Sequence, residues 1–243
     1  MAQRWYNGLK LWLEDFKRLS QIDWHWLSVW LSLYLSFLLL DIIAPQFSGS
    51  ALIKYLGIFL CLVYAIQKYR KDHLLNIAIL LTFVADTILV WTNHEASGVF
   101  VFCFAQMLHL SRLTRSNGHI VWYYAITIAL VLFFIIQLGD VLPIYAATAI
   151  YAFLLCANLV LSLRNYQRHQ NNFRARCCFY AFLCFVCCDC CVAARHLMLD
   201  GLITTQFLPL VSYLVWVFYY PSQVLMANSS LLPDAPTRRK IAK

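Results

Sequence analysis

The chain has few charged residues: Asp, Glu, Lys and Arg make up 12% of its 243 residues, whereas hydrophobic residues make up 62%. A soluble domain of this length carries about 25% charged and about 45–50% apolar residues. The mean hydropathy is +0.67. The scarcity of charge argues against a large water-soluble domain, and apolar runs of about 20 residues predict membrane-spanning helices.

Strand-like alternation is also missing from these runs, because no run repeats with period two as the strands of a barrel do. A backbone inside lipid must satisfy its own hydrogen bonds, so the apolar runs are expected to be helices. The predicted fold is an all-α membrane bundle of about eight helices. The expected spans are residues 26–43, 51–67, 73–92, 98–113, 119–138, 141–163, 176–199 and 203–226.

The basic residues are placed unevenly around these spans. With the N-terminus in the cytoplasm and eight alternating spans, all of the 19 basic residues except Lys54 and Arg195 fall on the cytoplasmic side. This bias follows the positive-inside rule and predicts that both termini are cytoplasmic, in a multi-pass protein of the cell membrane. The net charge of +8 is then explained by orientation and anionic lipid headgroups, and it does not require a nucleic-acid partner.

Outside the spans the chain has two short segments. Residues 1–25 lack the apolar core and cleavage site of a signal peptide and instead predict an interfacial amphipathic helix. Residues 26–226 form the expected transmembrane domain, and residues 227–243 a flexible basic tail on the cytoplasmic side. The apolar positions of the predicted amphipathic helix are Trp5, Leu9, Trp12, Phe16 and Leu19.

Cysteine is abundant in one place, because seven of the ten cysteines lie between residues 177 and 191. The spacing Cys184-x-x-Cys187 and Cys188-x-x-Cys191 is that of metal-binding pairs. A structural zinc site, however, draws its ligand pairs from separate loops, and here both pairs lie on one predicted helix. We therefore expect no metal site, and we interpret the cysteines as small helix-packing residues.

Polar residues inside the expected spans indicate the functional site. Asp86 lies in the third span and Asp189 in the seventh, and a charge at the bilayer centre costs at least about 2.5–3.5 kcal/mol. Such residues face the bundle interior and serve a function or form interhelical hydrogen bonds. Counting residues from the span ends places both aspartates, with Gln106 and His109 of the fourth span, in one layer from mid-membrane toward the outer half.

Two further polar residues follow Asp189 on the same predicted helix. His196 comes seven residues later, on the same helix face and closer to the surface. Arg195 points elsewhere, and its long side chain can reach a headgroup phosphate. Both are candidates for contacts with a lipid substrate.

The order of these residues resembles a known family. In the third span, "ADTILVW" has an aspartate, Asp86, followed by an apolar turn. The fourth span, "GVFVFCFAQMLHL", begins with Gly98 and continues with Phe102, as in that family. Gln106 then stands where the family has His, and His109 where it has Tyr.

Two more motifs lie near the end of the chain. "FVCCD" matches Phe, two residues, Ser-Asp, with Cys188 in place of Ser and Asp189 kept. "YPSQ" matches Tyr-x-x-Gln at Tyr220 and Gln223. Together, the motifs, spans and orientation resemble the YhhN-like lysoplasmalogenases, a family of eight-span membrane proteins.

The resemblance implies hydrolysis of the vinyl ether bond of lysoplasmalogens, which releases a fatty aldehyde and a glycerophospho-alcohol. That reaction needs a carboxylic acid to protonate carbon and a carboxylate to stabilise the cation and orient water. Asp86 and Asp189 are the candidate catalytic residues, and no cofactor is required. The candidate substrate-binding residues are Gln106, His109, Arg195, His196 and Gln223.

Two interpretations other than the hydrolase stay open at the level of sequence. The first is a relative that binds, transports or senses lipid without hydrolysing it; the substitutions at Gln106 and Cys188 are compatible with this loss of hydrolysis or with an altered substrate preference. The second is a scaffold in which the polar residues only pack helices. For the hydrolase and for the lipid-binding protein, the expected partner is a membrane lipid or lysolipid.

Overall fold

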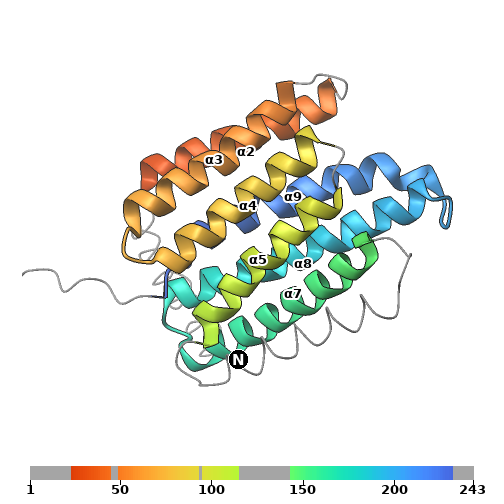
Figure 1. Cartoon of the computed structure of the whole chain (residues 1–243). Helices are drawn as coiled ribbons and strands as arrows, with labels where there is room; N and C mark the ends of the chain where they lie inside the picture. Colours follow the sequence, from red (N-terminus) through yellow and green to blue (C-terminus); the bar gives the residue numbers. More distant parts are fainter. Residues whose placement is uncertain (1–22, 45–48, 93–94, 115–142, 232–243) are drawn as a thin grey trace, which may run out of the picture.

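The computed structural model describes residues 23–44, 49–92, 95–114 and 143–231, and within these ranges the protein is all-α (Figure 1). A short 3-10 helix, η2 (Thr205–Phe207), precedes the last α-helix. The α-helices are α2 (Trp24–Ile43), α3 (Gly49–Lys68), α4 (His73–Trp91), α5 (Glu95–Thr114), α7 (Pro143–Arg168), α8 (Phe173–Leu199) and α9 (Leu208–Ala227).

Seven of the described helices are long and apolar enough to cross a membrane. They coincide with seven of the eight expected spans to within a few residues. The remaining expected span, residues 119–138, lies outside the described residues, as do the predicted N-terminal amphipathic helix up to residue 22 and the chain beyond residue 231. The protein is therefore a multi-pass helical membrane protein with seven spans in the described part of the chain.

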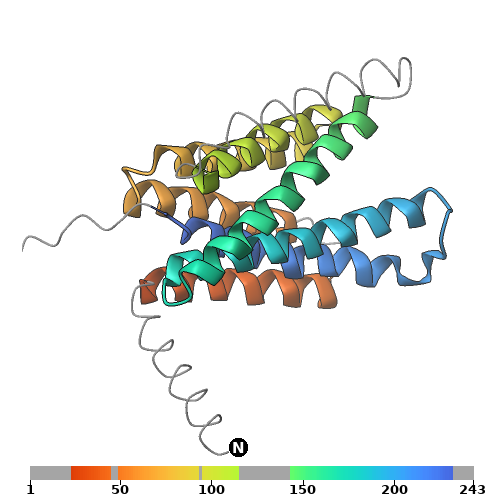
Figure 2. The same ribbon diagram turned by 90° about the horizontal axis from the view of Figure 1, so that it is seen from below.

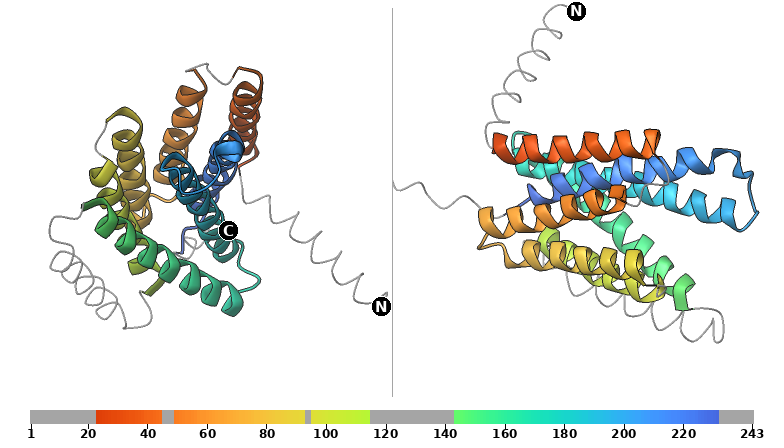
Figure 3. Two further views of the ribbon diagram at one scale, coloured as in Figure 1. Left: turned by 90° about the vertical axis from the view of Figure 1, so that its right-hand side faces the viewer. Right: turned by 90° about the horizontal axis from the view of Figure 1, so that it is seen from above.

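The helices form a bundle in which α9 is surrounded on several sides. Helix α9 packs against α2, α3, α4 and α8, while α5 packs between α4 and α7 (Figure 1). The bundle is seen from one end in Figure 3, left. Figure 2 shows α7 crossing α8 obliquely and the α8–α9 hairpin extending beyond the other helices. Residues 200–204 in its turn are exposed.

Helices α5 and α7 run parallel to each other. Cys103 donates from Sγ to the carbonyl oxygen of Ala147 at 3.6 Å, and further along both helices Asn158 donates to Gln106. Sequence numbers therefore rise in the same direction on the two neighbouring helices. As a result, α5 ends and α7 begins at opposite ends of the bundle.

Two tight turns lie at one end of the bundle, between α3 and α4 and between α7 and α8. Asp72 caps α4 by accepting a hydrogen bond from the backbone N–H of Leu75 at 3.2 Å. Asn172 caps α8 in the same way, from the N–H of Arg174 at 2.9 Å. We call this the basic end, because its turns and the adjacent helix ends carry Lys68, Arg70, Lys71, Arg168, Arg174 and Arg176.

The last span contains two prolines, and neither of them interrupts helix α9. Helix α9 continues through Pro221, and Pro209 lies in its first turn, where proline is tolerated. Pro221 has no N–H to donate to the carbonyl four residues earlier. That carbonyl, of Val217, instead accepts a hydrogen bond from the hydroxyl of Tyr34 on α2 at 3.1 Å. A side chain from a neighbouring helix thus replaces the missing bond.

The segment after α9 is packed, at least as far as residue 230. Asn228, Ser229 and Ser230 are buried at the basic end, and Asn228 accepts a hydrogen bond from the hydroxyl of Tyr64 on α3 at 2.7 Å. The expectation of a flexible tail from residue 227 onward therefore does not hold for these three residues. Their polar groups are buried because α3, α4 and α5 supply hydrogen-bond partners for them.

Candidate functional site

The first element of the site is Asp86 on α4, which is buried with 8% of its surface exposed. The hydroxyl of Tyr219 on α9 donates a hydrogen bond of 2.5 Å to its Oδ2. Asp86 faces the bundle because the positions around it that point outward, such as Val84 and Val90, are apolar and exposed. The carboxyl group is thus held between α4 and α9 by a short hydrogen bond.

The second element is Asp189 on α8, which is half-buried. The hydroxyl of Tyr151 on α7 donates a hydrogen bond of 2.6 Å to its Oδ2. The preceding residue, Cys188, is buried, and its thiol lies close enough to interact electrostatically with both Asp189 and Asp86. Cys188 therefore lies within electrostatic range of both carboxyl groups.

Aromatic rings connect the two carboxyl–tyrosine pairs. The ring of Phe185 contacts that of Tyr219 edge-on, with 5.6 Å between centroids. Phe102 continues the series, at 6.1 Å from Phe185 and 5.9 Å from Tyr151. Residues from α4, α5, α7, α8 and α9 thus meet at one depth. We call the set Asp86, Tyr151, Cys188, Asp189 and Tyr219 the carboxyl layer.

Gln106 and His109 are both buried on α5, but the structure gives them other partners. The amide nitrogen of Asn158 on α7 donates to both the side-chain and the backbone oxygen of Gln106, at 2.9 Å each. The His109 ring packs edge-on against Phe182, with 5.6 Å between centroids. Among the described residues, no hydrogen bond joins either side chain to an aspartate of the carboxyl layer.

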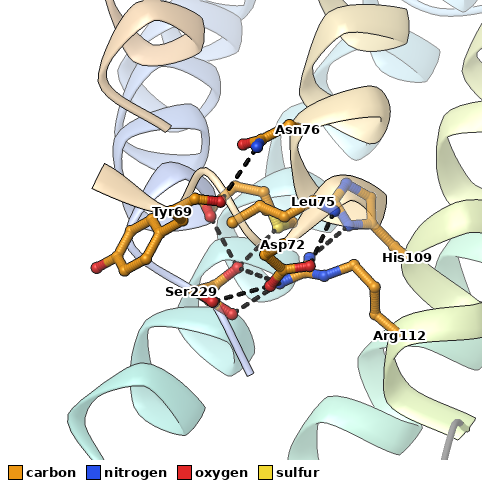
Figure 4. Close-up of polar contacts among 9 residues, drawn as sticks. Tyr69, Asp72, Leu75, Asn76, His109, Arg112 and Ser229 are labelled. Carbon is orange, nitrogen blue, oxygen red and sulfur yellow. Dashed lines mark hydrogen bonds and ion pairs between the residues drawn. The ribbon is translucent and has the colours of Figure 1, made fainter. Parts of the chain in front are cut away.

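His109 belongs to a second group of polar residues, at the basic end (Figure 4). Its Nδ1 lies 2.9 Å from Nη1 of Arg112, and Nη2 of Arg112 donates to the carbonyl oxygen of Ser229 at 2.8 Å. The carboxylate of Asp72 lies 3.9 Å from Arg112 and accepts a hydrogen bond of 2.8 Å from Ser230. We call these five residues the basic-end cluster.

The two groups lie at different depths. Phe182, which contacts His109, precedes Asp189 by seven residues on α8, or about 10 Å along the helix axis. The sequence had placed Gln106 and His109 in the same layer as the aspartates. The structure brings Asp86 and Asp189 into one layer with Cys188, while His109 joins the basic-end cluster and Gln106 lies between the two groups.

The other predicted contact residues differ in exposure. Gln223 is buried on α9, about one turn from Tyr219 toward the basic end, and its Nε2 lies 3.4 Å from Oγ of Ser222. Arg195 and His196 are exposed near the end of α8. No hydrogen bond between the described residues links Arg195 or His196 to the carboxyl layer.

Sequence reasoning missed the two tyrosines that hold the carboxyl groups. Tyr151 and Tyr219 are signalled only as hydroxyl-bearing residues inside apolar runs, and the chain has 14 tyrosines. Tyr220, named by its motif, has a different role: its hydroxyl donates to the carbonyl oxygen of Trp30 at 3.2 Å.

The ten cysteines all fall within the described residues, and all are free thiols. In the described ranges, no group of three or more His, Cys, Asp or Glu side chains is arranged to hold a metal ion. Cys188 is buried and lies within electrostatic range of both carboxyl groups, whereas Cys156 and Cys190 are exposed.

A multi-pass helical bundle with two interior carboxyl–tyrosine pairs defines an integral membrane protein with a polar site inside its spans. The chain belongs to the YhhN family, whose family model matches residues 49–230. This range includes α3 to α9 and the whole carboxyl layer. In two further comparisons, no curated protein and no solved structure matched the chain.

Proposed function

We propose that the protein is a lysoplasmalogenase-like hydrolase that cleaves the vinyl ether bond of lysolipids inside the membrane. The observation that supports this proposal best is the carboxyl layer, in which two aspartates from different helices lie at one depth, each with one tyrosine donor. Ionisable residues within spans are costly and serve a function by default. Membership of the YhhN family points to the same chemistry.

The proposed reaction divides the work between the two carboxyl groups. One of them, as the acid, transfers its proton to the outer carbon of the vinyl ether double bond, which creates an oxocarbenium-like cation. The other, as the carboxylate, stabilises this cation and accepts a proton from the water that attacks it. The resulting hemiacetal gives its hydroxyl proton to the first carboxyl group, which is now a carboxylate, while the second carboxyl group returns its proton to the glycerol oxygen. The bond between the carbon and the glycerol oxygen breaks, an aldehyde and an alcohol are released, and both carboxyl groups regain their starting states. One water is consumed, and no oxidant or metal takes part.

The two departures from the family motifs have different weight in this proposal. Gln106 is bonded to Asn158 and does not contact the carboxyl groups, so a change at this position affects helix packing between α5 and α7. Cys188 precedes Asp189 in the chain and lies within electrostatic range of Asp86. A thiol there is a weaker hydrogen-bond donor than the serine hydroxyl of the family. We therefore assign any change in substrate preference to Cys188.

We also propose an eight-span topology with both termini in the cytoplasm. Since α5 and α7 are parallel neighbours, the chain between residues 114 and 143 has to return to the other end of the bundle. The expected span at residues 119–138 is long and apolar enough for that crossing. The basic end then faces the cytoplasm, and the carboxyl layer lies toward the other side. The charge bias favours the cell membrane as its location.

The test is aldehyde release by the purified full-length protein. Choline and ethanolamine lysoplasmalogens are the substrates, and a saturated ether lysolipid with the same chain is the control, because it lacks the double bond that must be protonated. Aldehyde from the vinyl ether lipids alone supports the hydrolase. Tight binding of all of them with no aldehyde would contradict it and favour a lipid-binding, transport or sensing protein.

A further inference from the structure

A buried lysine lies beside the carboxyl layer. Lys54 on α3 is 8% exposed, although it lies inside a membrane-spanning helix. Its Nζ lies 2.6 Å from Oδ2 of Asp41 on α2, and it also faces the rings of Trp216 at 4.9 Å and Phe37 at 5.5 Å. A buried lysine is costly in lipid, so this position calls for an explanation.

Two independent contacts place this lysine at the depth of Asp86. The next residue, Tyr55, shares a hydrogen bond of 2.6 Å with Thr87, the residue that follows Asp86 on α4. In addition, Trp216 contacts the ring of Tyr219 at 5.6 Å, and Tyr219 donates to Asp86. The Trp216 ring therefore connects the ammonium group of Lys54 to Tyr219 of the carboxyl layer.

We propose that Lys54 binds the phosphate of a glycerophospholipid whose ether-linked carbon lies at the carboxyl layer. This inference rests on the proposed function, because it assigns the part of the substrate that the two aspartates leave unbound. In a lysoplasmalogen only the glycerol backbone separates the vinyl ether oxygen from the phosphate. A cation beside the carboxyl layer is thus suited to bind the phosphate while the vinyl ether lies between the aspartates.

Asp41 acts in this scheme as a resident anion that the phosphate replaces. Its side chain is 17% exposed, near the end of α2, so the ion pair can be reached from that side. A phosphate brings the same sign of charge and several strong acceptor oxygens. The aromatic rings of Trp216 and Phe37 keep the ammonium in place by cation–π attraction during the exchange.

The competing explanation is that the ion pair only joins α2 to α3. In that case Lys54 and Asp41 have equivalent roles, and removing either one leaves a buried charge without its partner. Phosphate binding instead makes the two residues unequal, because only Lys54 contacts the ligand. A comparison of single and double variants separates these explanations.

The experiment measures the Kd of two non-hydrolysable lipids for the purified full-length protein in detergent. One is a saturated 1-alkyl-glycerophosphoethanolamine, and the other is the 1-alkylglycerol with the same chain, which lacks the phosphate. We expect the wild type to bind the phosphate-bearing lipid about 10- to 100-fold more tightly, the range for a hydrogen bond to a charged group. Asp41→Asn should keep this preference, whereas the double variant Asp41→Asn/Lys54→Gln should lose it.

The double variant is used because it removes both charges and leaves neither one unpaired. The matched control is Lys68→Gln, which removes a lysine from the basic end of the same helix and should keep the preference. Equal binding of the two lipids by the wild type, or an unchanged preference in the double variant, would overturn the proposal. Because Kd does not depend on turnover, an inactive wild type that still prefers the phosphate-bearing lipid contradicts the hydrolase but supports the phosphate site.

Discussion

Each carboxyl group in the layer has one tyrosine hydroxyl as its donor. Variants that keep this hydrogen bond but remove the acidic proton can therefore distinguish a catalytic role of the aspartate from a role in helix packing. Replacing an aspartate by asparagine keeps the side-chain shape and an acceptor oxygen for the tyrosine but removes the exchangeable proton. We expect Asp86→Asn and Asp189→Asn each to lower kcat for aldehyde release by about 100-fold or more, as is typical for the loss of a general acid or base.

The structural role alone would give a different result for these two variants. Interhelical hydrogen bonds in membranes contribute only about 0.6–2 kcal/mol, so asparagine would substitute well for an aspartate that only joins helices. Because asparagine keeps these hydrogen bonds, we expect both variants to elute and unfold like the wild type, whichever role the aspartates have. Only the turnover then distinguishes the two roles. Near-normal turnover in either one would remove that aspartate from the mechanism.

The tyrosines are expected to have smaller effects. Tyr151→Phe and Tyr219→Phe keep the rings that contact Phe102 and Phe185 but leave one carboxyl oxygen without its donor. Losing such a bond to a charged group costs about 1.5–3 kcal/mol, so we expect kcat to fall by about 10- to 100-fold. Steady-state kinetics check this.

The control for the tyrosine variants is Tyr180→Phe, which removes a hydroxyl from an exposed position of α8 and should leave the rate unchanged. A rate loss in Tyr180→Phe as large as in the other two would show that tyrosine hydroxyls affect the fold in general and not the carboxyl groups.

The residues that the sequence could identify are those whose presence in lipid is costly. Asp86 and Asp189 stand out because a carboxyl group in an apolar run needs a reason to be there. Tyr151 and Tyr219 do not stand out, because tyrosine is common in membrane proteins and carries no charge. Lys54 was visible as a basic residue on the wrong side of the charge bias, but its partners come from α2 and α9.

At the level of the helices, Gly57 lets the backbone of α3 approach the Tyr220 ring of α9 closely. A methyl group added at Gly57 would lie 2.2 Å from Cε2 of Tyr220. The Tyr220 ring cannot easily move away, because it stacks on Tyr34 at 5.4 Å between centroids and donates to Trp30. We expect Gly57→Ala to lower the free energy of unfolding by about 1–3 kcal/mol, the usual cost of overpacking.

Equilibrium unfolding in mixed detergent micelles measures this effect. Ala51→Val on the same helix is the control, since Ala51 is exposed and its added methyl groups should meet no packed neighbour. If Gly57→Ala unfolds at the same point as the wild type, α3 and α9 do not require a glycine at their crossing.

The helices themselves could be predicted closely from apolar run length, because backbone satisfaction in lipid leaves few other options. Their rotation and tilt could not. The depth of His109 estimated from residue counts placed it with the aspartates, but its ring packs against Phe182 of α8 and its Nδ1 lies beside Arg112 on its own helix instead. Such offsets depend on the packing of neighbouring helices, which a count along a single helix does not contain.

For the molecule as a whole, orientation is the main expectation to test. A protease site inserted in the exposed turn at residues 70–71 should be cleaved from the cytoplasmic side, and one inserted at residues 201–203 from the opposite side. Tags at the two termini should both be cytoplasmic. The reason is the concentration of basic residues at one end of the bundle.

Cleavage of both inserted sites from one side would contradict the odd number of crossings proposed between them, namely α4, α5, residues 119–138, α7 and α8. Termini on opposite sides would contradict the proposed crossing between α5 and α7. The control is an insertion in the middle of α8, which should abolish expression. It shows that the turns accept an inserted protease site whereas a membrane-spanning helix does not.

The basic-end cluster also affects how the protein is synthesised. Arg112 is translated 117 residues before Ser229, the residue whose carbonyl oxygen accepts its hydrogen bond. Until then the guanidinium group of α5 has no partner from the end of the chain, so a partly made protein presents an incompletely paired cation at the membrane surface. We expect cellular quality control to distinguish unfinished chains from finished ones by this cation. A chain stopped after residue 231 should persist in a pulse-chase experiment, whereas one stopped after residue 227 should be degraded.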